Sequence, residues 1–583
     1  MNFMKKYLSY ILLGLIVLIA VVLRLYKLGE APAGLYVDEA GQGYSAYSIL
    51  KTGRDEFGKS FPIVFRSLTD FKTPVYIYLI VPLIPLFGLT PFTVRLPSFI
   101  FSILTIPVLF FLIKRLFKDK QSLAKSKFGE KLALLSCFLL AISPWHILFG
   151  RTNFECNVAL FFFLSGVLFF YKGLEKPKTL ILSALMFGIA IPAYHSQRII
   201  TPLIMTILFI KFRKILLDKI HKKYLIYSII LGFVITLPTL SVISTPGFLA
   251  RATGLNIFSH LHQMPDGFIA SYKGILSPIV NGSWFLTTRE FFSLYFSYLS
   301  PRYMFLLGDS GPRSSFPELS TFFLWQFPFY IYGIWILLTK KNISDLKFLT
   351  IALLIASPIP AAVTRDPYTT IRSLPLVIPQ LIVISLGILE IYSKLKIGFV
   401  KKTSLLLFYA VVIYSICKLY SSVIVLNEYY RAKAWDYGWQ QVTSIIQGLN
   451  TDLPIVTDNA RSDAYPQIAF YLKYDPLKFQ KENFEVPTNE YYTNLYHNSE
   501  KHIGKIVTRP INWEKDLLVD QYLIADELGI SLQQIKTHKL ILISEVKYPD
   551  GATAYRIVRT NPEFTKEEQR LFNSRKQVER GFP

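Results

Sequence analysis

Long apolar runs constrain this chain more than any other feature. Three of them, "YLSYILLGLIVLIAVVL" (7–23), "LPSFIFSILTIPVLFFLI" (96–113) and "SLLLFYAVVIYSICKLY" (404–420), each approach the roughly 20 residues needed to cross about 30 Å of hydrocarbon. Only 17% of the 583 residues are charged, whereas about a quarter are charged in ordinary soluble domains. The sequence therefore predicts an α-helical protein that crosses a membrane several times.

The net charge of +24 is concentrated in short segments between the apolar runs. Lys and Arg in loops between transmembrane helices mark the cytoplasmic side. The chain has neither an RNA-binding motif nor a basic soluble face, so we expect no nucleic-acid partner. Five basic loops are predicted to be cytoplasmic: 114–131, 172–178, 211–223, 340–347 and 394–402.

These loops fix the direction of each crossing. The segment "PVYIYLIVPLIPLFG" (74–88) is short and contains Pro82 and Pro85, which break a helix ladder. We therefore expect an interfacial or re-entrant helix there, on the outer side. The first run lacks a small-residue cleavage site and is predicted to be an uncleaved anchor. Besides the first helix and one at about 93–113, crossings are predicted at 131–149, 158–171, 179–193, 199–212, 224–244, 319–339, 346–363, 372–393 and 403–421, about eleven in all, with the N-terminus inside and the C-terminus outside.

This topology divides the chain into a membrane domain, 1–422, and an extracytoplasmic α/β domain, 423–583. Two long outer segments, 24–92 and 245–318, belong to the membrane domain. In the tail, "LPIVTDN" (453–459) predicts a buried strand before a helix near 464–474. "LILISEVKYPDGATAYRIV" (540–558) predicts two strands around a Pro-Asp-Gly turn.

Positive residues in short outer loops contradict the usual charge distribution and need a reason. They anchor the chain at the interface, or extend to lipid phosphate, or form a site, since ionisable residues at membrane depth are costly. Arg is the natural ligand of a phosphate because its planar fork matches two oxygens. The outer ionisable residues are Lys72, Arg95, Arg151, Glu155, His195, Arg198, Arg365 and Arg372.

The stretch "VDEAGQGYSAYSIL" places Asp38 and Glu39 side by side after the first crossing. A carboxylate at the water–lipid boundary can accept the proton of an incoming hydroxyl while cations hold a phosphate leaving group. One base opposite one cationic clamp is a single-displacement geometry, which inverts a sugar's anomeric centre. The alternative is that Asp38 only caps a helix starting at Glu39.

Neither cysteines nor acidic clusters predict a metal site. The three cysteines, Cys137, Cys156 and Cys417, are scattered, and no metal-ligand spacing occurs. We therefore expect no cofactor other than the sugar donor itself as substrate.

The segment "YVDEAGQGYSAYSILKTGRDEFGKSFPIVF", continued by "FKTPVYIYLIVPLIPLFGLTPFTVRLPS", resembles the first outer loop of the GT-C glycosyltransferase superfamily. The nearest resemblance is to protein O-mannosyltransferases and lipid A aminoarabinose transferases, which use phospholipid-linked sugars. It extends over about 30–200 and recurs at 295–315 and 357–379. It implies a GT-C fold with juxtamembrane helices in the first outer loop.

The resemblance also implies roles for individual residues. Asp38 matches the catalytic Asp, Glu155 a second acid in the next outer loop, and Glu39 a supporting acid. Lys72 matches a Lys that contacts donor phosphate, although this chain has "FKTP" where the relatives have Lys-Pro-Pro. Further candidates for phosphate or structural clamps, for lining the site, or for the loop that closes over it are Arg95, Arg151, Arg198, Arg365, Arg372, Tyr194, His195 and Asp309.

The expected activity is transfer of a sugar from a polyprenyl phosphate or diphosphate to a hydroxyl of a protein, glycan or lipid, in a prokaryotic plasma membrane. An O-antigen-type polymerase or ligase is one alternative, but those enzymes lack the Asp-Glu pair in the first loop. A lipid-linked sugar transporter is another, and it predicts charges along the spans rather than at their ends. The C-terminal domain either recognises the acceptor or braces the outer loops.

Overall fold

The computed structural model describes residues 2–67, 70–117, 123–249, 257, 282–340, 343–364, 366–395, 398–461 and 463–579. The chain forms two compact units. Unit 1 comprises residues 1–28, 73–76 and 95–425, and unit 2 comprises residues 29–72, 77–94 and 426–583.

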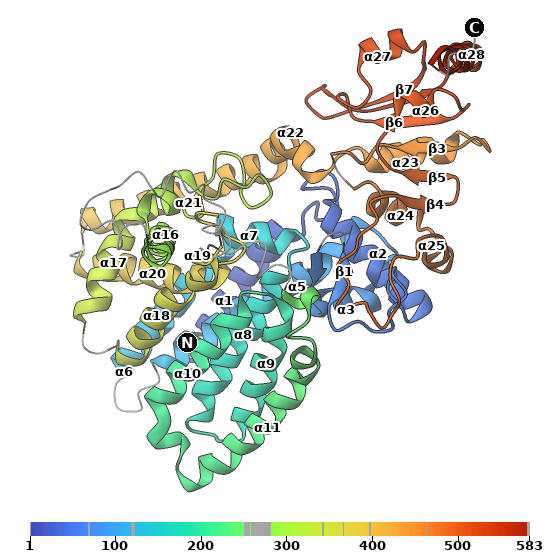
Figure 1. Ribbon diagram of the computed structural model, residues 1–583. Helices are drawn as coiled ribbons and strands as arrows, with labels where there is room; N and C mark the ends of the chain where they lie inside the picture. Colours follow the sequence, from blue (N-terminus) through green and yellow to red (C-terminus); the bar gives the residue numbers. More distant parts are fainter. Residues whose placement is uncertain are drawn as a thin grey trace. The chain divides into compact units, whose positions relative to one another are not determined.

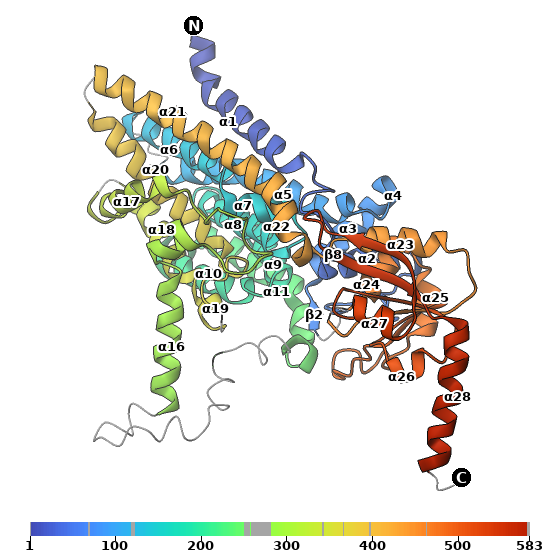
Figure 2. The same ribbon diagram turned by 90° about the horizontal axis from the view of Figure 1, so that it is seen from above.

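Unit 1 is built almost entirely from apolar helices. Helices α8 and α9 lie side by side, and α9 also packs against α11 (Figure 1). In Figure 2, α16 extends away from the packed helices of this unit. The helices are α1 (Asn2–Leu25), α5 (Pro91–Leu116), α6 (Leu123–Ala141), α7 (Pro144–Arg151), α8 (Glu155–Gly173), α9 (Thr179–Ala193), α10 (Gln197–Leu216), α11 (Lys219–Ser241), α16 (Ser283–Ser297), η2 (Tyr303–Leu307), η3 (Leu324–Gln326), α17 (Phe327–Thr339), α18 (Ser344–Ala356), α19 (Ile359–Ala362), η5 (Leu374–Leu376), α20 (Val377–Lys394), α21 (Phe399–Tyr420) and η6 (Ser421–Leu426).

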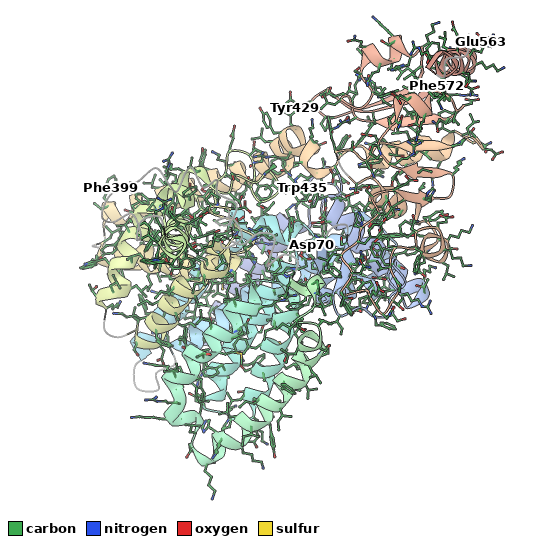
Figure 3. All side chains as sticks on the ribbon, in the orientation of Figure 1. Asp70, Phe399, Tyr429, Trp435, Glu563 and Phe572 are labelled. Carbon is green, nitrogen blue, oxygen red and sulfur yellow. The ribbon has the colours of Figure 1, made fainter. Side chains whose placement is uncertain are left out.

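Many of these helices are suited to a bilayer. Within the described ranges, seven helical segments are long and apolar enough to cross a membrane, and the bent pair α6–α7 adds an eighth if it is one span. The outer surface of α21 is apolar, and Phe399 at its start, labelled in Figure 3, is 84% exposed. The chain is therefore an integral, multi-pass membrane protein.

The predicted continuous crossing at 131–149 is wrong in one respect. Its helix stops at Ala141, and α7 starts at Pro144 with a bend of 58°. Proline at the first position of a helix is preorganised to begin one, and the Ser143 hydroxyl accepts a hydrogen bond from His146 N–H. Sequence hydropathy carries no sign of this break, since both pieces are apolar.

The short helix expected at 74–88 is confirmed as a broken one. It consists of α3 (Pro74–Ile80), η1 (Val81–Leu83) and α4 (Ile84–Phe87). Pro82 and Pro85 lie at the starts of η1 and α4, where a missing N–H costs little. Gly88 ends the segment with a φ of 74°.

Unit 2 contains a mixed six-stranded sheet in the order β4-β5-β3-β6-β8-β7. Strand β3 is parallel to both β5 and β6, and the other pairs are antiparallel. The predicted strand at 453–459 and the predicted hairpin at 540–558 are confirmed. The elements after residue 426 are α22 (Asn427–Arg431), η7 (Ala432–Trp435), α23 (Trp439–Gly448), β3 (Ile455–Thr457), α24 (Tyr465–Leu472), α25 (Pro476–Glu482), β4 (Lys501–Ile503), β5 (Ile506–Thr508), α26 (Trp513–Asp516), β6 (Tyr522–Ala525), α27 (Leu532–Thr537), β7 (Ile541–Lys547), β8 (Thr553–Arg559) and α28 (Pro562–Glu579).

The same unit includes elements from the first outer segment. These are helix α2 (Val37–Thr52) and the hairpin of β1 (Phe65–Ser67) and β2 (Asp70–Lys72). Tyr44 of α2 belongs to the hydrophobic core that contains Trp439, Ile455 and Phe479. Residues 29–72 and the C-terminal residues therefore fold around one core, whereas the predicted division at residue 422 assigned them to different domains.

Candidate active site

Helix α2 begins at Val37, after the extended residue Tyr36. Two N–H groups at this helix start donate to the carboxylates of Glu39 and Asp436. Tyr36 N–H donates to Glu39 Oε2 (3.2 Å), and Val37 N–H donates to Asp436 Oδ2 (2.8 Å). Asp38 therefore lies within the first turn, and the alternative in which it caps a helix starting at Glu39 is wrong.

Asp38 forms an ion pair with Lys72. Lys72 ends β2, where it lies opposite Phe65, and its Nζ is 3.0 Å from Asp38 Oδ2. The Lys72 side chain is only 7% exposed, whereas 22% of the Asp38 side chain is accessible. Burying the ammonium group of Lys72 costs solvation free energy, and the attraction to the Asp38 carboxylate offsets part of that cost. The structure thus brings together the two residues to which sequence analysis assigned the base and the phosphate contact.

Glu39 is fully buried. Its bond from Tyr36 N–H holds the first turn of α2 and is the kind of contact expected of a supporting acid. A direct part in catalysis stays a prediction.

A second acidic pair, Asp55 and Glu56, was missed by sequence analysis. Both carboxyl groups are buried. The Tyr491 hydroxyl donates to Asp55 Oδ2, and the Ser45 hydroxyl donates to Glu56 Oε2 at 2.6 Å. Burial raises the pKa of both groups, and the nearby Asp55 carboxylate raises that of Glu56 further. The only signal was the Asp-Glu repeat in "GRDEFG" (53–58), which does not reveal burial.

In unit 1, Arg95 and Arg151 are buried near the end of α1. Arg151 Nη1 donates to the carbonyl oxygens of Leu23 (3.1 Å) and Arg24 (3.0 Å), and Arg95 Nη1 donates to that of Leu28 (3.3 Å). Cations stabilise the negative end of a helix dipole. These contacts give both arginines a structural role, and contact with a donor phosphate stays a prediction.

Asp309 links two segments of unit 1 that are far apart in the sequence. Its Oδ2 accepts hydrogen bonds from Thr370 N–H (2.7 Å) and the Thr370 hydroxyl (2.8 Å), and its Oδ1 accepts one from Gly311 N–H (2.8 Å). Burial raises the pKa of Asp309, and these bonds oppose that shift. In the same region Arg372 Nη1 donates to Thr364 Oγ1 at 2.7 Å and to Asp366 Oδ2 at 3.0 Å. Arg365 lies outside the described residues.

The other candidates in unit 1 are spread over two helix starts. Glu155 is the buried first residue of α8, where a carboxylate is favoured by the helix dipole. Tyr194 is buried and contacts His195 edge-to-face at 6.0 Å between ring centroids. The Arg198 guanidinium lies 3.7 Å from the centre of the Phe248 ring, a cation–π distance. Their roles in substrate binding stay predictions.

An apolar cavity of about 480 Å³ lies within unit 1, between α8, α9, α10 and α11. Its lining includes Phe187, Gly188, Met205, Phe209 and Phe233. This mostly apolar lining, whose polar side chains are the hydroxyls of Ser183, Thr206, Ser228 and Thr236, suits a hydrocarbon chain. Among the residues that the structure describes, no group of three or more His, Cys, Asp or Glu side chains could hold a metal ion.

Comparison with known proteins identifies one family and one fold. Residues 71–241 match the family model described as dolichyl-phosphate-mannose-protein mannosyltransferase. No curated protein matches the chain.

Solved structures with a similar fold span nearly the whole chain. The structure of ArnT from Cupriavidus metallidurans bound to undecaprenyl phosphate is 14% identical, with a TM-score of 0.50, covering 94% of this chain and 98% of that one. The archaeal oligosaccharyltransferase AglB from Archaeoglobus fulgidus, in complex with an inhibitory peptide and a dolichol-phosphate, is 13% identical, with a TM-score of 0.48, covering 95% of this chain and 74% of that one.

The family match confirms the resemblance seen in the sequence, and the ArnT likeness shows that the fold extends from the membrane helices into the C-terminal sheet. Residues 71–241 are therefore similar to the dolichyl-phosphate-mannose-protein mannosyltransferase family, and the chain as a whole has an ArnT-like membrane fold.

Proposed function

We propose that this protein transfers a sugar from a polyprenyl-phosphate donor to an acceptor hydroxyl, with Asp38 as the general base. The observation that carries the proposal is the 3.0 Å pair of Asp38 and Lys72 at the start of α2. It couples a partly accessible carboxylate to a nearly buried ammonium group. A proton acceptor and a cation are the two groups that this transfer requires.

The reaction is a single displacement at the anomeric carbon. The acceptor oxygen forms its bond to that carbon as the bond to the donor phosphate oxygen breaks. Asp38 takes the proton of the acceptor hydroxyl, and the negative charge that develops on the leaving phosphate is stabilised by Lys72. An ammonium group has three donors, so Lys72 can contact a phosphate oxygen while it still contacts Asp38. The sugar is transferred with inversion.

Two comparisons support the donor class. The segment that matches the mannosyltransferase family begins at residue 71 and so includes Lys72. The ArnT structure with the similar fold was solved with undecaprenyl phosphate. That this chain binds a donor of the same class is our inference from these similarities. Additional phosphate contacts are proposed for Arg95, Arg151, Arg198, Arg365 and Arg372, and a second acidic role for Glu155.

We further propose that the chain crosses the membrane eleven times, with its N-terminus in the cytoplasm and Asp38 on the outer face of a prokaryotic plasma membrane. The eight candidate spans, counting the bent pair as one, are supplemented in this proposal by α9, α10 and the η3–α17 helix. The sequence supports this arrangement through five basic loops, because Lys and Arg between membrane helices favour the cytoplasmic side. The acceptor is a hydroxyl of a protein, a glycan or a lipid.

The test is turnover in proteoliposomes with a panel of radiolabelled polyprenyl-phosphate sugars and a crude envelope acceptor. Asp38→Asn removes the base but keeps an acceptor oxygen and nearly the same shape. Asp70→Asn is the matched control, because Asp70, labelled in Figure 3, lies on the same hairpin as Lys72 and accepts a bond from Phe71 N–H at 2.7 Å. We expect Asp38→Asn to bind donor and lose at least about a hundredfold in kcat, while Asp70→Asn stays close to wild type.

Wild-type activity in Asp38→Asn would refute the base assignment. Donor binding by the wild type with flipping of the lipid but without transfer would instead favour a transporter. Polymerised glycan as the product would favour the polymerase or ligase alternative.

A further inference from the structure

Helix α2, which carries Asp38, is capped by a residue that lies 399 positions after Val37 in the sequence. Asp436 Oδ2 accepts a hydrogen bond of 2.8 Å from Val37 N–H, the residue directly before Asp38. We infer that Asp436 is a positioning residue for the transfer reaction, because its carboxylate fixes the first turn of α2 and with it the direction of the Asp38 side chain. This inference rests on the proposed function, in which Asp38 accepts the proton.

The backbone on both sides is shaped for this contact. Asp436 has a φ of 51°, and Gly438 a φ of 105°, so the chain turns sharply after η7. On the other side Gly34 has a φ of 92°, and a Cβ there would lie 2.3 Å from the carbonyl oxygen of Trp435. Only glycine permits both that conformation and that approach. The two segments are therefore held in van der Waals contact at the start of α2.

Further contacts fix the residues before Val37. The rings of Tyr36 and Trp435 meet edge-to-face, with centroids 6.4 Å apart, and Trp435 is fully buried. The Gln467 side-chain amide donates to the carbonyl oxygen of Leu35 at 2.5 Å. Asp436 thus accepts its hydrogen bond at a partly buried position beside the fully buried Trp435, and a bond to an ionised acceptor is stronger than one between neutral groups.

The carboxylates at the helix start have different partners. Glu39 accepts from Tyr36 N–H and Asp436 accepts from Val37 N–H. Asp38 Oδ2, in the same turn, lies 3.0 Å from Lys72 Nζ. If Asp436 were removed, Val37 N–H would lose this acceptor, and the first turn of α2 would hold Asp38 less firmly in its position beside Lys72.

The Lys72 side is held by C-terminal residues as well. Arg66 N–H donates to the Tyr491 hydroxyl at 2.6 Å, Arg66 Nη1 donates to the Asn494 carbonyl oxygen at 2.6 Å, and Arg66 Nε lies 3.2 Å from Glu485 Oε2. Arg66 is on β1, the partner strand of β2. C-terminal residues of unit 2 therefore contact the elements that carry both members of the reactive pair, and Asp436 bonds directly to the turn that contains Asp38.

The experiment compares four variants of the full-length protein. Asp436→Ala removes the acceptor. Asp436→Asn keeps an oxygen that can accept the same bond and a side chain that tolerates the left-handed backbone. Asp436→Glu keeps the charge but displaces it by one methylene, and so tests the geometry if the Ala variant does not fold. The matched control is Asn512→Ala, which removes a cap of the same kind from α26, where Asn512 Oδ1 accepts from Glu514 N–H (3.1 Å) and Lys515 N–H (3.2 Å).

Two measurements are made on each variant. Hydrogen exchange of the peptide spanning residues 34–44 reports on the first turn of α2 and requires no donor. Steady-state kinetics use the radiolabelled undecaprenyl-phosphate sugar that the wild type turns over. We expect Asp436→Ala and Asp436→Glu to exchange faster in this peptide and to lose about ten- to a hundredfold in kcat, with the KM for donor changed by less than about threefold. Asp436→Asn should restore most of both properties, and Asn512→Ala should change neither.

The inference is overturned if hydrogen exchange of the 34–44 peptide in Asp436→Ala equals that of the wild type. It is also overturned if Asn512→Ala loses as much kcat as Asp436→Ala does. An Asp436→Asn variant as impaired as Asp436→Ala also overturns it, since the hydrogen bond would then not be what matters. Asp38→Asn is measured in parallel. If Asp38→Asn keeps wild-type activity, the proposed function fails whatever Asp436 does; if it is inactive while Asp436→Ala is fully active, only the positioning role fails.

Discussion

At the scale of single residues, Gly43 shows why α2 needs small side chains. A Cβ at Gly43 would lie 2.6 Å from the Phe470 ring and 2.8 Å from Val94 Cγ2, closer than non-bonded carbon atoms approach. At Gly41 a Cβ would meet only Pro466, at the ordinary contact distance of 3.9 Å. Gly43 thus permits the close approach of α24 to α2.

We predict opposite effects for two matched substitutions on this helix. Gly43→Ala should destabilise unit 2 by about 1–3 kcal/mol, because the added methyl overpacks a buried site. Gly41→Ala should be neutral or stabilise by up to about 1 kcal/mol, because alanine has the higher helix propensity. Thermal unfolding of the detergent-solubilised protein measures both. A higher midpoint for Gly43→Ala than for Gly41→Ala would contradict the packing argument.

The residues of the reactive pair differ in how far the sequence reveals them. Asp38 and Lys72 could be proposed because they carry charge in an outer segment of a membrane protein and match a known pattern. Asp436 could not, because "AWDYGW" (434–439) contains only a weak turn signal and nothing in it refers to residue 37. A hydrogen bond across 399 positions has no local signature.

At the scale of elements, the buried acids after α2 link it to the segment around Tyr491. Asp55 Oδ1 accepts from Lys59 N–H (2.8 Å) and Phe57 N–H (3.1 Å), and the Gln480 amide donates to the Asp55 carbonyl oxygen at 2.8 Å. The charges around the pair are those of Arg66, which lowers the pKa of Asp55, and of Glu485, which raises that of Glu56. Desolvation is the largest cause, so both carboxyl groups bind protons more tightly when folded than when unfolded.

This sign gives a prediction for stability against pH. The folded state holds more protons than the unfolded state, so the free energy of unfolding falls as pH rises from about 4 through the raised pKa values. We expect the thermal midpoint to decrease between about pH 5 and pH 8. Glu56→Gln should flatten this slope because the side chain no longer titrates. Glu514→Gln, a change at an exposed acid of α26, should keep the wild-type slope. Equal slopes in all three proteins would contradict the prediction.

Apolar length indicated which segments form membrane helices, and turn residues indicated the hairpin β7–β8. Of the interruptions, the proline-broken segment at 74–88 was predicted and the break at Ser143 was not. The break at Ser143 and the union of α2 with the C-terminal sheet depend on packing between distant segments. A hydropathy profile depends only on local composition and therefore carries no information on contacts between distant segments.

At the scale of the whole molecule, the arrangement across the membrane follows from charge. We predict that Asp550, exposed in the β7–β8 turn, faces outward, and that Lys219, exposed at the start of α11, faces the cytoplasm. In a Cys417→Ser background, which removes the one exposed cysteine, an impermeant maleimide applied to intact cells should label Asp550→Cys. It should label Lys219→Cys only after lysis. Labelling in the reverse order would invert the proposed topology.

The hydrogen bond between Val37 and Asp436 forms only after both partners have been synthesised, so α2 is capped late in translation. The ribosome adds about 5–20 residues per second, so about 20–80 s separate the synthesis of the two partners, which lie 399 positions apart. During that interval the nascent chain inserts its first helices with the start of α2 still uncapped by Asp436. On the proposed mechanism, a growing or prematurely terminated chain occupies the membrane without consuming lipid-linked sugar. Full activity begins only once the translation of the C-terminal part has supplied the cap.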